Sequence, residues 1–347
     1  MYILGIETSC DETSAAIVKN DKTILSNKIA SSLNLHKKYG GVVPEIACRH
    51  HLECINYVIK EALEEAGVKF KDIDLIAVTH GPGLVGALLI GLSAAKAISY
   101  ALSVPLVGVN HLYAHVYSAF MSKENKVRFP ATGLIVSGGH TTLVSILGYN
   151  KFKLIGQTRD DAAGEAFDKA AKVLGIGYPG GPEIEKKAKN GNPQAIRFPR
   201  AYMEKGSFDF SFSGVKTALL YYVTRRGHPA VGRSNQGVPI GDTHATINDV
   251  CASFQAAIFD VIVDKAIAAC KKQNTTQLFV GGGVSINKTL QDMLIKKATP
   301  EGIKVFLPAK GLFTDNAAMV AAAGYRLYKE GIRSNYSLEA EPNLGIG

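Results

Sequence analysis

The chain has 347 residues, of which 46% are hydrophobic and 20% are charged. This composition is ordinary for a globular protein and excludes an intrinsically disordered chain or a long coiled coil. The formal net charge of +9 favours a polyanionic partner, because fixed positive potential attracts phosphate backbones. Much of this charge lies in two basic runs, which a solvated surface explains equally well: Lys186, Lys187, Lys189, Arg197, Arg200 and Lys205, and then Arg225, Arg226 and Arg233.

The cysteines and the apolar segments predict a cytoplasmic protein with no membrane association. The cysteines form no CxxC pair and are odd in number, which favours free thiols: Cys10, Cys48, Cys54, Cys251 and Cys270. No basic segment precedes the apolar residues of the N-terminus, so we expect a first strand there and no signal peptide. The most apolar stretch, 85–106, contains Lys96 and several small polar residues, and we expect a buried helix there instead of a membrane span.

The first hundred residues predict alternating strands and helices. Strands are expected at 2–7, 13–18 and 23–27, with a polar link at 8–13 and a turn at 20–21. Apolar residues at helical spacing predict a helix over 44–66, where Gly67 follows as a stop signal. Next come a strand at 74–79, a glycine-rich turn at 80–86, an apolar helix at 84–102 and a strand at 105–109.

A second unit begins near Phe129 and repeats the pattern of the first. It has a strand at 131–136, a polar glycine turn at 137–142 and a strand at 143–147. Two units of this kind suggest two lobes with a nucleotide cleft between them. A later strand at 277–280 leads into a glycine turn and a helix, whereas 224–246 lacks periodicity and is expected to be an exposed loop.

Three glycine-rich turns are candidates for phosphate contact. They lie at 137–139, 178–182 and 281–283, and two of them directly follow apolar strands. Such turns expose backbone N–H groups and let a phosphate approach closely. None matches the P-loop or the dinucleotide-binding fingerprint. One such turn is usually structural, but three together favour nucleotide binding.

His111 and His115 are four residues apart, which places both imidazoles on one face of a helix. A third metal ligand must come from elsewhere, and Asp315 is a candidate. Two histidines and one carboxylate suit Fe(II) or Zn(II). From spacing alone, two histidines that only pack or meet solvent are the more frequent case. Leu112 stands where a zinc peptidase of the HExxH type needs its glutamate, which argues against that chemistry.

Two groups of carboxylates are further candidates for chemistry. Asp11 and Glu12 lie in the polar link between the first two strands, and a second group lies at 160–168. Spacing predicts Asp161, Glu165 and Asp168 on one helical face, which is either solvated or able to contact a ligand. No GxSxG motif and no defensible Cys–His pair is present, so catalysis by positioning and electrostatics is favoured over a covalent intermediate.

A series of blocks, in the family's order along the chain, resembles the TsaD family. They are GIETSCDETS at 5–14, YGGVVPE at 39–45, GPGLVGAL at 81–88, NHLYAH at 110–115, LIVSGGHT at 134–141, DDAAGEAFDK at 160–169, YPGGP at 178–182, FSFSGVKT at 210–217, GGGVSIN at 281–287 and TDNAAM at 314–319. The resemblance runs from residue 3 to about residue 325, and the blocks together are highly specific.

The resemblance implies an α/β, two-lobed actin/hexokinase/Hsp70-like (ASKHA) fold with a nucleotide cleft. One lobe would comprise 1–128 with 311–347 packed on it, and the other 129–310. The implied activity transfers L-threonylcarbamoyl from threonylcarbamoyl-AMP to N6 of adenosine 37, in tRNAs that read ANN codons, forming t6A. The implied partners, besides tRNA, are a TsaB-like paralogue and a TsaE-like ATPase. ATP or ADP would fit the same cleft.

The resemblance also implies roles for individual residues. His111, His115 and Asp315 would hold one divalent metal, usually iron in this family, and Asp11 and Glu12 would be needed for activity. The adenylate phosphate would lie against Ile135, Val136, Ser137, Gly138 and Gly139. The rest of the substrate would contact Asp168, Gly181, Glu185 and Asn287.

Two departures and two alternatives accompany the resemblance. Many relatives have a histidine where this chain has Asn110, and the loop at 224–246 is longer and more basic than in many of them. The alternatives are a non-catalytic actin-like scaffold that binds ATP and a metallopeptidase. The complete set of metal-ligand candidates argues against the first, and the missing glutamate argues against the second.

Overall fold

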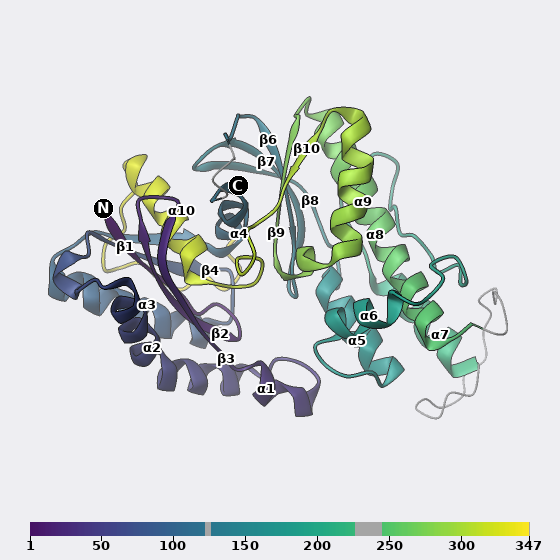
Figure 1. Cartoon of the computed structure of the whole chain (residues 1–347), viewed down its shortest axis with the longest axis horizontal. Coiled ribbons are helices and arrows are strands. Elements are labelled where there is room, and N and C mark those ends of the chain that lie inside the picture. The colour runs from purple at the N-terminus through teal and green to yellow at the C-terminus, as the bar shows by residue number, and fades with distance from the viewer. Residues whose placement is uncertain (122–125, 226–244, 347) are drawn as a thin grey trace.

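The computed structural model describes residues 1–121, 126–225 and 245–346. The strands in these ranges form two five-stranded sheets (Figure 1). The first has the order β3-β2-β1-β4-β5 and contains β1 (Tyr2–Glu7), β2 (Glu12–Lys19), β3 (Thr23–Ser31), β4 (Leu75–Gly81) and β5 (Leu106–Asn110). The second has the order β10-β9-β6-β7-β8 and contains β6 (Ala131–Val136), β7 (Thr141–Gly148), β8 (Lys151–Gln157), β9 (Gln277–Gly281) and β10 (Lys304–Phe306).

The two sheets share one topology. Each begins with an antiparallel hairpin, β1 with β2 and β6 with β7, and each first strand also pairs in parallel with a later strand, β4 or β9. The repeated strand–turn–strand pattern expected from the sequence is therefore confirmed. Ligands of sheets with parallel strands bind beyond the carboxyl ends of the strands. The polar turns after β1 and β6 lie at such ends.

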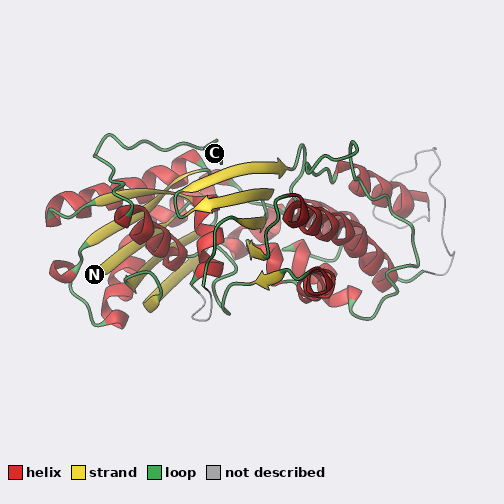
Figure 2. Ribbon diagram, turned by 90° about the horizontal axis from the view of Figure 1, so that it is seen from above, coloured by secondary structure: helices red, strands yellow, loops and turns green. Residues whose placement is uncertain are grey.

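The helices form layers around the sheets (Figures 1 and 2). On the first sheet, α2 (Pro44–Ala66) and α3 (Val85–Leu102) cover one face, and α4 (His111–Phe120) and α10 (Ala317–Lys329) cover the other. Because α4 also packs against β6 and β9, it lies between the two sheets. The far face of the second sheet packs against α5 (Ala163–Leu174), α6 (Gly180–Ala188), α7 (Ser213–Arg225), α8 (Ile247–Lys272) and α9 (Lys288–Ala298). A short helix, α1 (Leu33–His36), follows β3.

Two expectations need correction, and one helix was not expected. The third strand continues to Ser31 instead of ending at 27, because it pairs with β2 along its whole length. The loop expected at 224–246 is too long at both ends, since α7 runs to Arg225 and Thr246 caps α8. The rest of that segment, 226–244, lies outside the described residues. The sequence did not reveal α8, because this helix is buried on most sides and lacks a one-sided apolar stripe.

Within the described residues, α3 is the one helix long and apolar enough to span a membrane by composition. Its inner face packs on β4 and α2, but only 33% of the apolar window is buried. The expectation of a buried helix therefore holds for the inner face alone. Val85, Leu89 and Tyr100 are more than half exposed on the outer face.

Candidate metal and nucleotide site

A cleft of about 310 Å³ lies where turns from both sheets meet. The turns after β1, β4 and β6 contribute to it, together with the first residue of α4, the glycine turn after β9 and the segment before α10. Its lining residues are Ser9, Cys10, Asp11, Glu12, Pro82, Gly83, Leu84, His111, Ser137, Gly138, Gly139, His140, Gly283, Thr314 and Asp315.

The three expected metal ligands lie together beside this cleft. Asn110 caps α4, because its side-chain oxygen accepts hydrogen bonds from the backbone N–H groups of Leu112 and Tyr113. The helix then presents His111 and His115 on one face, as the spacing predicts. Asp315 Oδ1 lies 3.1 Å from His115 Nε2 and 3.6 Å from His111 Nε2. One ligand atom from each residue lies within 4.8 Å of the others.

The donor set fits a cation. His115 is completely buried, and neither of its ring nitrogens makes a hydrogen bond of good geometry, although Nε2 lies near Asp315. Buried polar atoms are rarely left unpaired, so these nitrogens indicate a missing partner. Two imidazoles and a carboxylate are compatible with one Fe(II) or Zn(II) ion.

Glu7 is a candidate site residue that the sequence alone did not indicate. It is fully buried at the end of β1, and its Oε2 lies 3.0 Å from His111 Nδ1. The same carboxylate accepts hydrogen bonds from Thr79 Oγ1 at 2.7 Å and from Ser9 N at 2.6 Å. A carboxylate on the outer nitrogen of a metal-binding histidine fixes the ring orientation and tautomer. The clue was an acidic residue inside an otherwise apolar strand.

Opposite charges stabilise each other within this group. Burial alone would lower the pKa of His111, but Asp315 and Glu7 raise it to about 9. Burial would raise the pKa of Asp315, yet the charge of His111 and the contact with His115 lower it instead. Burial and the charges of His111 and His115 lower the pKa of His140 to about 4, so this cleft residue carries a neutral imidazole.

The turn after β6 forms the opposite wall of the cleft. A Cβ atom added to Gly138 or Gly139 would meet nothing within 4 Å, so both glycines are open to a ligand. The start of α5 packs directly against this turn, because the N–H groups of Gly164 and Glu165 donate to the carbonyls of Ser137 and Gly138. The turn is therefore rigidly held and able to receive a phosphate.

Of the three carboxylates predicted to share one helical face, Glu165 and Asp168 lie on α5 but Asp161 does not. Because α5 begins at Ala163, Asp161 precedes the helix, and it pairs with Lys169 at 2.6 Å and Lys216 at 2.5 Å. Asp160 accepts hydrogen bonds from Ser211, Phe212 and Ser213. Both side chains are thus used to join α5 to α7, which corrects the expectation for Asp161.

Comparison of the whole sequence with known proteins identifies its family. The sequence profile of TsaD, described as tRNA N6-adenosine threonylcarbamoyltransferase, matches residues 23–322. Two proteins of that same name are each 50% identical to this chain. One, from Symbiobacterium thermophilum, aligns over 99% of this chain and 97% of its own length; the other, from Bacillus subtilis, aligns over 100% and 96%. The chain belongs to the TsaD family. Membership of this family supports the transferase, and it supports neither of the two alternatives, the scaffold and the peptidase.

Solved structures of low sequence identity share the fold. HypF from T. kodakarensis is similar with a TM-score of 0.62 and 15% identity, over 95% of this chain and 48% of HypF. Component A of the Acidaminococcus fermentans (R)-2-hydroxyglutaryl-CoA dehydratase is similar with a TM-score of 0.56 and 15% identity, over 95% of this chain and 98% of its own. At such low identity the likeness shows the fold alone. The two-lobed actin/hexokinase/Hsp70-like fold is therefore confirmed.

The other residues expected to contact the substrate in a TsaD protein do not line the cleft. Ile135 and Val136 are fully buried in β6, behind the turn. Four others do not line the cleft, and their roles stay predictions: Asp168, Gly181, Glu185 and Asn287. Asp168 accepts a hydrogen bond from Gly180 N, and Glu185 accepts one from Lys288 N. Asn287 caps α9 and donates to Gln255.

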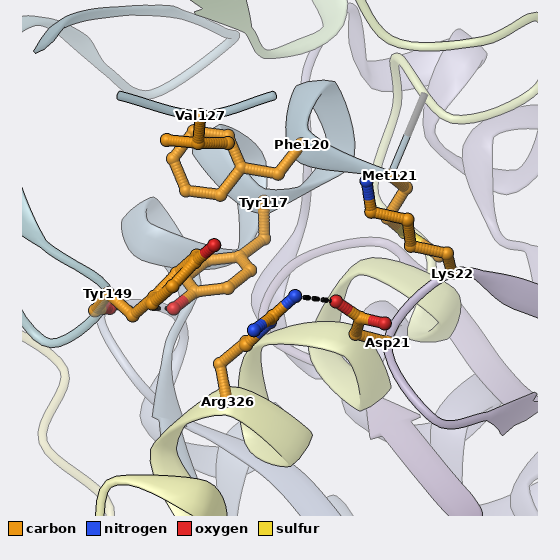
Figure 3. Close-up of a pocket in the computed structure, with 8 residues that line it drawn as sticks. All are labelled: Asp21, Lys22, Tyr117, Phe120, Met121, Val127, Tyr149 and Arg326. Carbon is orange, nitrogen blue, oxygen red and sulfur yellow. Dashed lines mark hydrogen bonds and ion pairs between the residues drawn. The ribbon is translucent and has the colours of Figure 1, made fainter. Parts of the chain in front are cut away.

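A second, smaller pocket lies elsewhere on α4 (Figure 3). It is lined by Asp21, Lys22, Tyr117, Phe120, Met121, Val127, Tyr149 and Arg326. Arg326 pairs with Asp21 and lies 4.4 Å from the ring centre of Tyr149, whose carbonyl accepts a hydrogen bond from Tyr117 at 2.6 Å. These contacts pack α10 against the β7–β8 turn, so we regard this pocket as structural.

Proposed function

We propose that this chain transfers the L-threonylcarbamoyl group from threonylcarbamoyl-AMP to N6 of adenosine 37 in tRNAs that read ANN codons. In this reaction the N6 nitrogen bonds to the carbamoyl carbon. The bond from that carbon to the phosphate oxygen breaks, AMP leaves, and N6 loses one proton. Such a reaction needs a phosphate site, a proton acceptor and stabilisation of developing negative charge.

A single observation carries this proposal. One cleft brings together the open glycine turn at 137–139, the group of His111, His115 and Asp315, and the carboxyl groups of Asp11 and Glu12. We propose that the turn holds the adenylate phosphate, and that the three ligands hold one divalent metal, with Fe(II) as the first candidate. A bound divalent metal supplies Lewis-acid polarisation of an oxygen and a template for orientation.

The two carboxyl groups of the turn after β1 are predicted to contribute unequally. Burial and the negative charges of Asp11 and Asp315 raise the pKa of Glu12, which favours the protonated form of this carboxyl group. We therefore assign Asp11 as the proton acceptor. Asp11→Asn is expected to lower kcat by about 100-fold or more, as loss of a general base does. Glu12→Gln should lower kcat less than Asp11→Asn does. Single-turnover assays of both variants check that the loss lies in the chemical step, and an equal loss contradicts the assignment.

Adenylate binding is predicted to depend on the ionisation of Asp168. Burial and the charges of Asp11 and Glu165 raise the pKa of Asp168 to about 6, against the hydrogen bond from Gly180. If a substrate hydroxyl donates to the ionised carboxylate, binding favours that form and weakens as the pH falls through about 6. Calorimetric titration of a stable adenylate analogue from pH 5 to 8 should show this loss, and Asp168→Asn should remove the pH dependence. A wild-type affinity that is constant over this range would contradict the contact.

We also propose the arrangement of lobes and partners. One lobe comprises 1–128 with 311–347, supported by the packing of α10 on the first sheet, and the other comprises 129–310. The exposed apolar side chains of α3 and the 67% exposed Leu52 of α2 offer a surface for a TsaB-like paralogue. A TsaE-like ATPase is proposed from the family resemblance.

The proposed partner surface is testable with one charged substitution. Leu89 is 51% exposed, so Leu89→Asp should leave the melting temperature nearly unchanged while abolishing co-elution with the TsaB-like paralogue in size-exclusion chromatography. The matched control is Ile295→Asp. Ile295 lies on α9, in the other half of the chain, and is 46% exposed. Co-elution that survives Leu89→Asp would place the partner elsewhere.

The activity itself is tested by modification of tRNA in vitro. Purified protein, with and without the two partners, is incubated with threonylcarbamoyl-AMP and unmodified ANN-reading tRNA, and nucleosides are analysed by mass spectrometry. We expect threonylcarbamoyladenosine with the wild type and none with His111→Ala. Absence of product with all partners and added iron would overturn the proposal and favour a nucleotide-binding scaffold.

A further inference from the structure

The turn after β1 carries Asp11 and Glu12, and three separate elements hold its backbone carbonyls. Leu84 N, just before α3, donates to the carbonyl of Ser9 at 2.8 Å. Ser32 N, just after β3, donates to the carbonyl of Asp11 at 3.0 Å. Between these two, Nε2 of His51 lies 3.0 Å from the carbonyl of Cys10.

Among these three partners, His51 contacts the turn through its side chain alone, whereas Ser32 also donates from its hydroxyl to the Asp11 carbonyl at 2.8 Å. His51 projects from α2, is completely buried, and its Nδ1 lies 2.8 Å from Thr13 Oγ1. Because a carbonyl can only accept, Nε2 carries the hydrogen and Nδ1 accepts from the Thr13 hydroxyl. Burial lowers the pKa of His51, which favours the neutral ring that this arrangement requires. The ring therefore joins residues on both sides of Asp11 and Glu12.

The position of His51 on α2 connects the cleft with the outside of the protein. Its neighbour Leu52 is 67% exposed on the outer face of the same helix. This is the face proposed above for the paralogue. Helix α2 therefore carries both the side chain that contacts the turn and part of the surface proposed for the paralogue.

We propose that His51, on α2, is a positioning residue, which fixes residues 10–13, where the turn after β1 enters β2, so that Asp11 and Glu12 face the cleft. Its hydrogen bonds go to Thr13 and Cys10, and not to the three candidate metal ligands. This inference rests on the proposed transferase function for its kinetic consequence. Its structural consequence, an ordered turn, is independent of that function.

Two similar substitutions separate positioning from simple stabilisation of the core. In His51→Gln the side-chain amide nitrogen reaches the position of Nε2 and keeps the bond to Cys10. In His51→Asn the shorter amide reaches the position of Nδ1 and keeps only the bond to Thr13. Stabilisation alone predicts similar losses for both, whereas positioning predicts that glutamine preserves the turn better than asparagine.

The experiment compares three variants at position 51, with Gln, Asn or Leu, with the control His50→Gln. His50 is the neighbouring histidine on the same helix, and it contacts Cys54. Order in the turn is measured without substrate, by hydrogen exchange of the amides at 9–13 and by the rate of maleimide labelling of Cys10. Cys48, which is also free and partly exposed, serves as the internal reference. Thermal unfolding and the kcat and KM of transfer are measured on the same samples.

Asparagine and leucine at position 51 are expected to speed exchange at 9–13 and labelling of Cys10, and to lower kcat by about 100-fold, as misplacement of a catalytic group does. KM for tRNA should change by no more than about twofold, because the turn is not assigned to ground-state binding. Glutamine should stay within about fivefold of the wild-type kcat, and His50→Gln should match the wild type.

Two results would overturn the inference. One is unchanged exchange and labelling in His51→Leu. The other is an equal loss of kcat and of melting temperature in the glutamine and asparagine variants, which indicates a structural role only. Failure of the proposed function is distinguishable, because it would appear as a wild type without transfer while exchange and labelling still report on the turn.

Discussion

Asp315→Ala is expected to abolish metal binding and to lower kcat/KM by more than ~100-fold. Loss of a group that only hydrogen-bonds a metal ligand costs up to about 100-fold, and loss of a ligand itself should cost more. Asp315 is the one anionic ligand in the group, and its Oδ1 lies within 3.6 Å of Nε2 of both histidines. Without it, the two imidazoles would hold the cation with no anionic ligand, and the nearest carboxylate would be Glu7 on the far side of His111. Metal content by mass spectrometry and t6A formation should fall together.

A matched control for this variant is Lys310→Ala, an exposed residue in the same segment before α10. It should keep full metal content and full activity. Transfer that persists in metal-free Asp315→Ala would show that the group of His111, His115 and Asp315 is structural. It would also remove the main support for metal-assisted chemistry in the cleft.

Glu7→Gln is expected to weaken metal binding by about 10–100-fold, the usual effect of losing an outer carboxylate partner. Glutamine has nearly the shape of glutamate, but its amide group must present a donor to Thr79, His111 or the N–H of Ser9. At least one buried donor then stays unpaired, which costs about 1–3 kcal/mol of folding free energy. Metal titration and thermal unfolding measure the two effects separately.

Thr79→Val is the comparison for Glu7→Gln. It removes the hydrogen bond from Thr79 to Glu7 but leaves the contact between Glu7 and His111 intact. This variant should lose stability with little change in metal affinity. If Glu7→Gln also binds metal with the wild-type affinity, Glu7 stabilises the core without orienting His111.

The sequence was most informative where a local pattern determines the structure. The spacing of His111 and His115 sufficed to place both rings on one face, because helical periodicity is independent of the rest of the fold. The alternation of short apolar runs and polar turns likewise predicted both opening hairpins. Periodicity failed for α8, which is surrounded by other elements, and for the start of α5, where Asp161 was placed on the helix although it precedes it.

The candidate site was predictable only in part, for a related reason. Motif residues such as Asp11, Gly138 and Asp315 could be named, since each lies in a block that resembles a known family. Glu7, His51 and His140 could not be assigned roles, because their roles depend on neighbours far away in the sequence. His51 and Cys10 are 41 residues apart, and Glu7 and His111 are 104 apart.

The sequence by itself therefore determined the family, the two repeated units and the metal-ligand candidates, since these depend on local spacing and on the order of specific blocks. Only the tertiary structure decided which polar groups meet. It brought Asp315 to the two histidines, placed a buried carboxylate behind one of them, and directed Asp160 and Asp161 into a structural contact with α7. Hydrogen bonds and charge interactions act over a few ångströms, so their partners are fixed by packing and not by position along the chain.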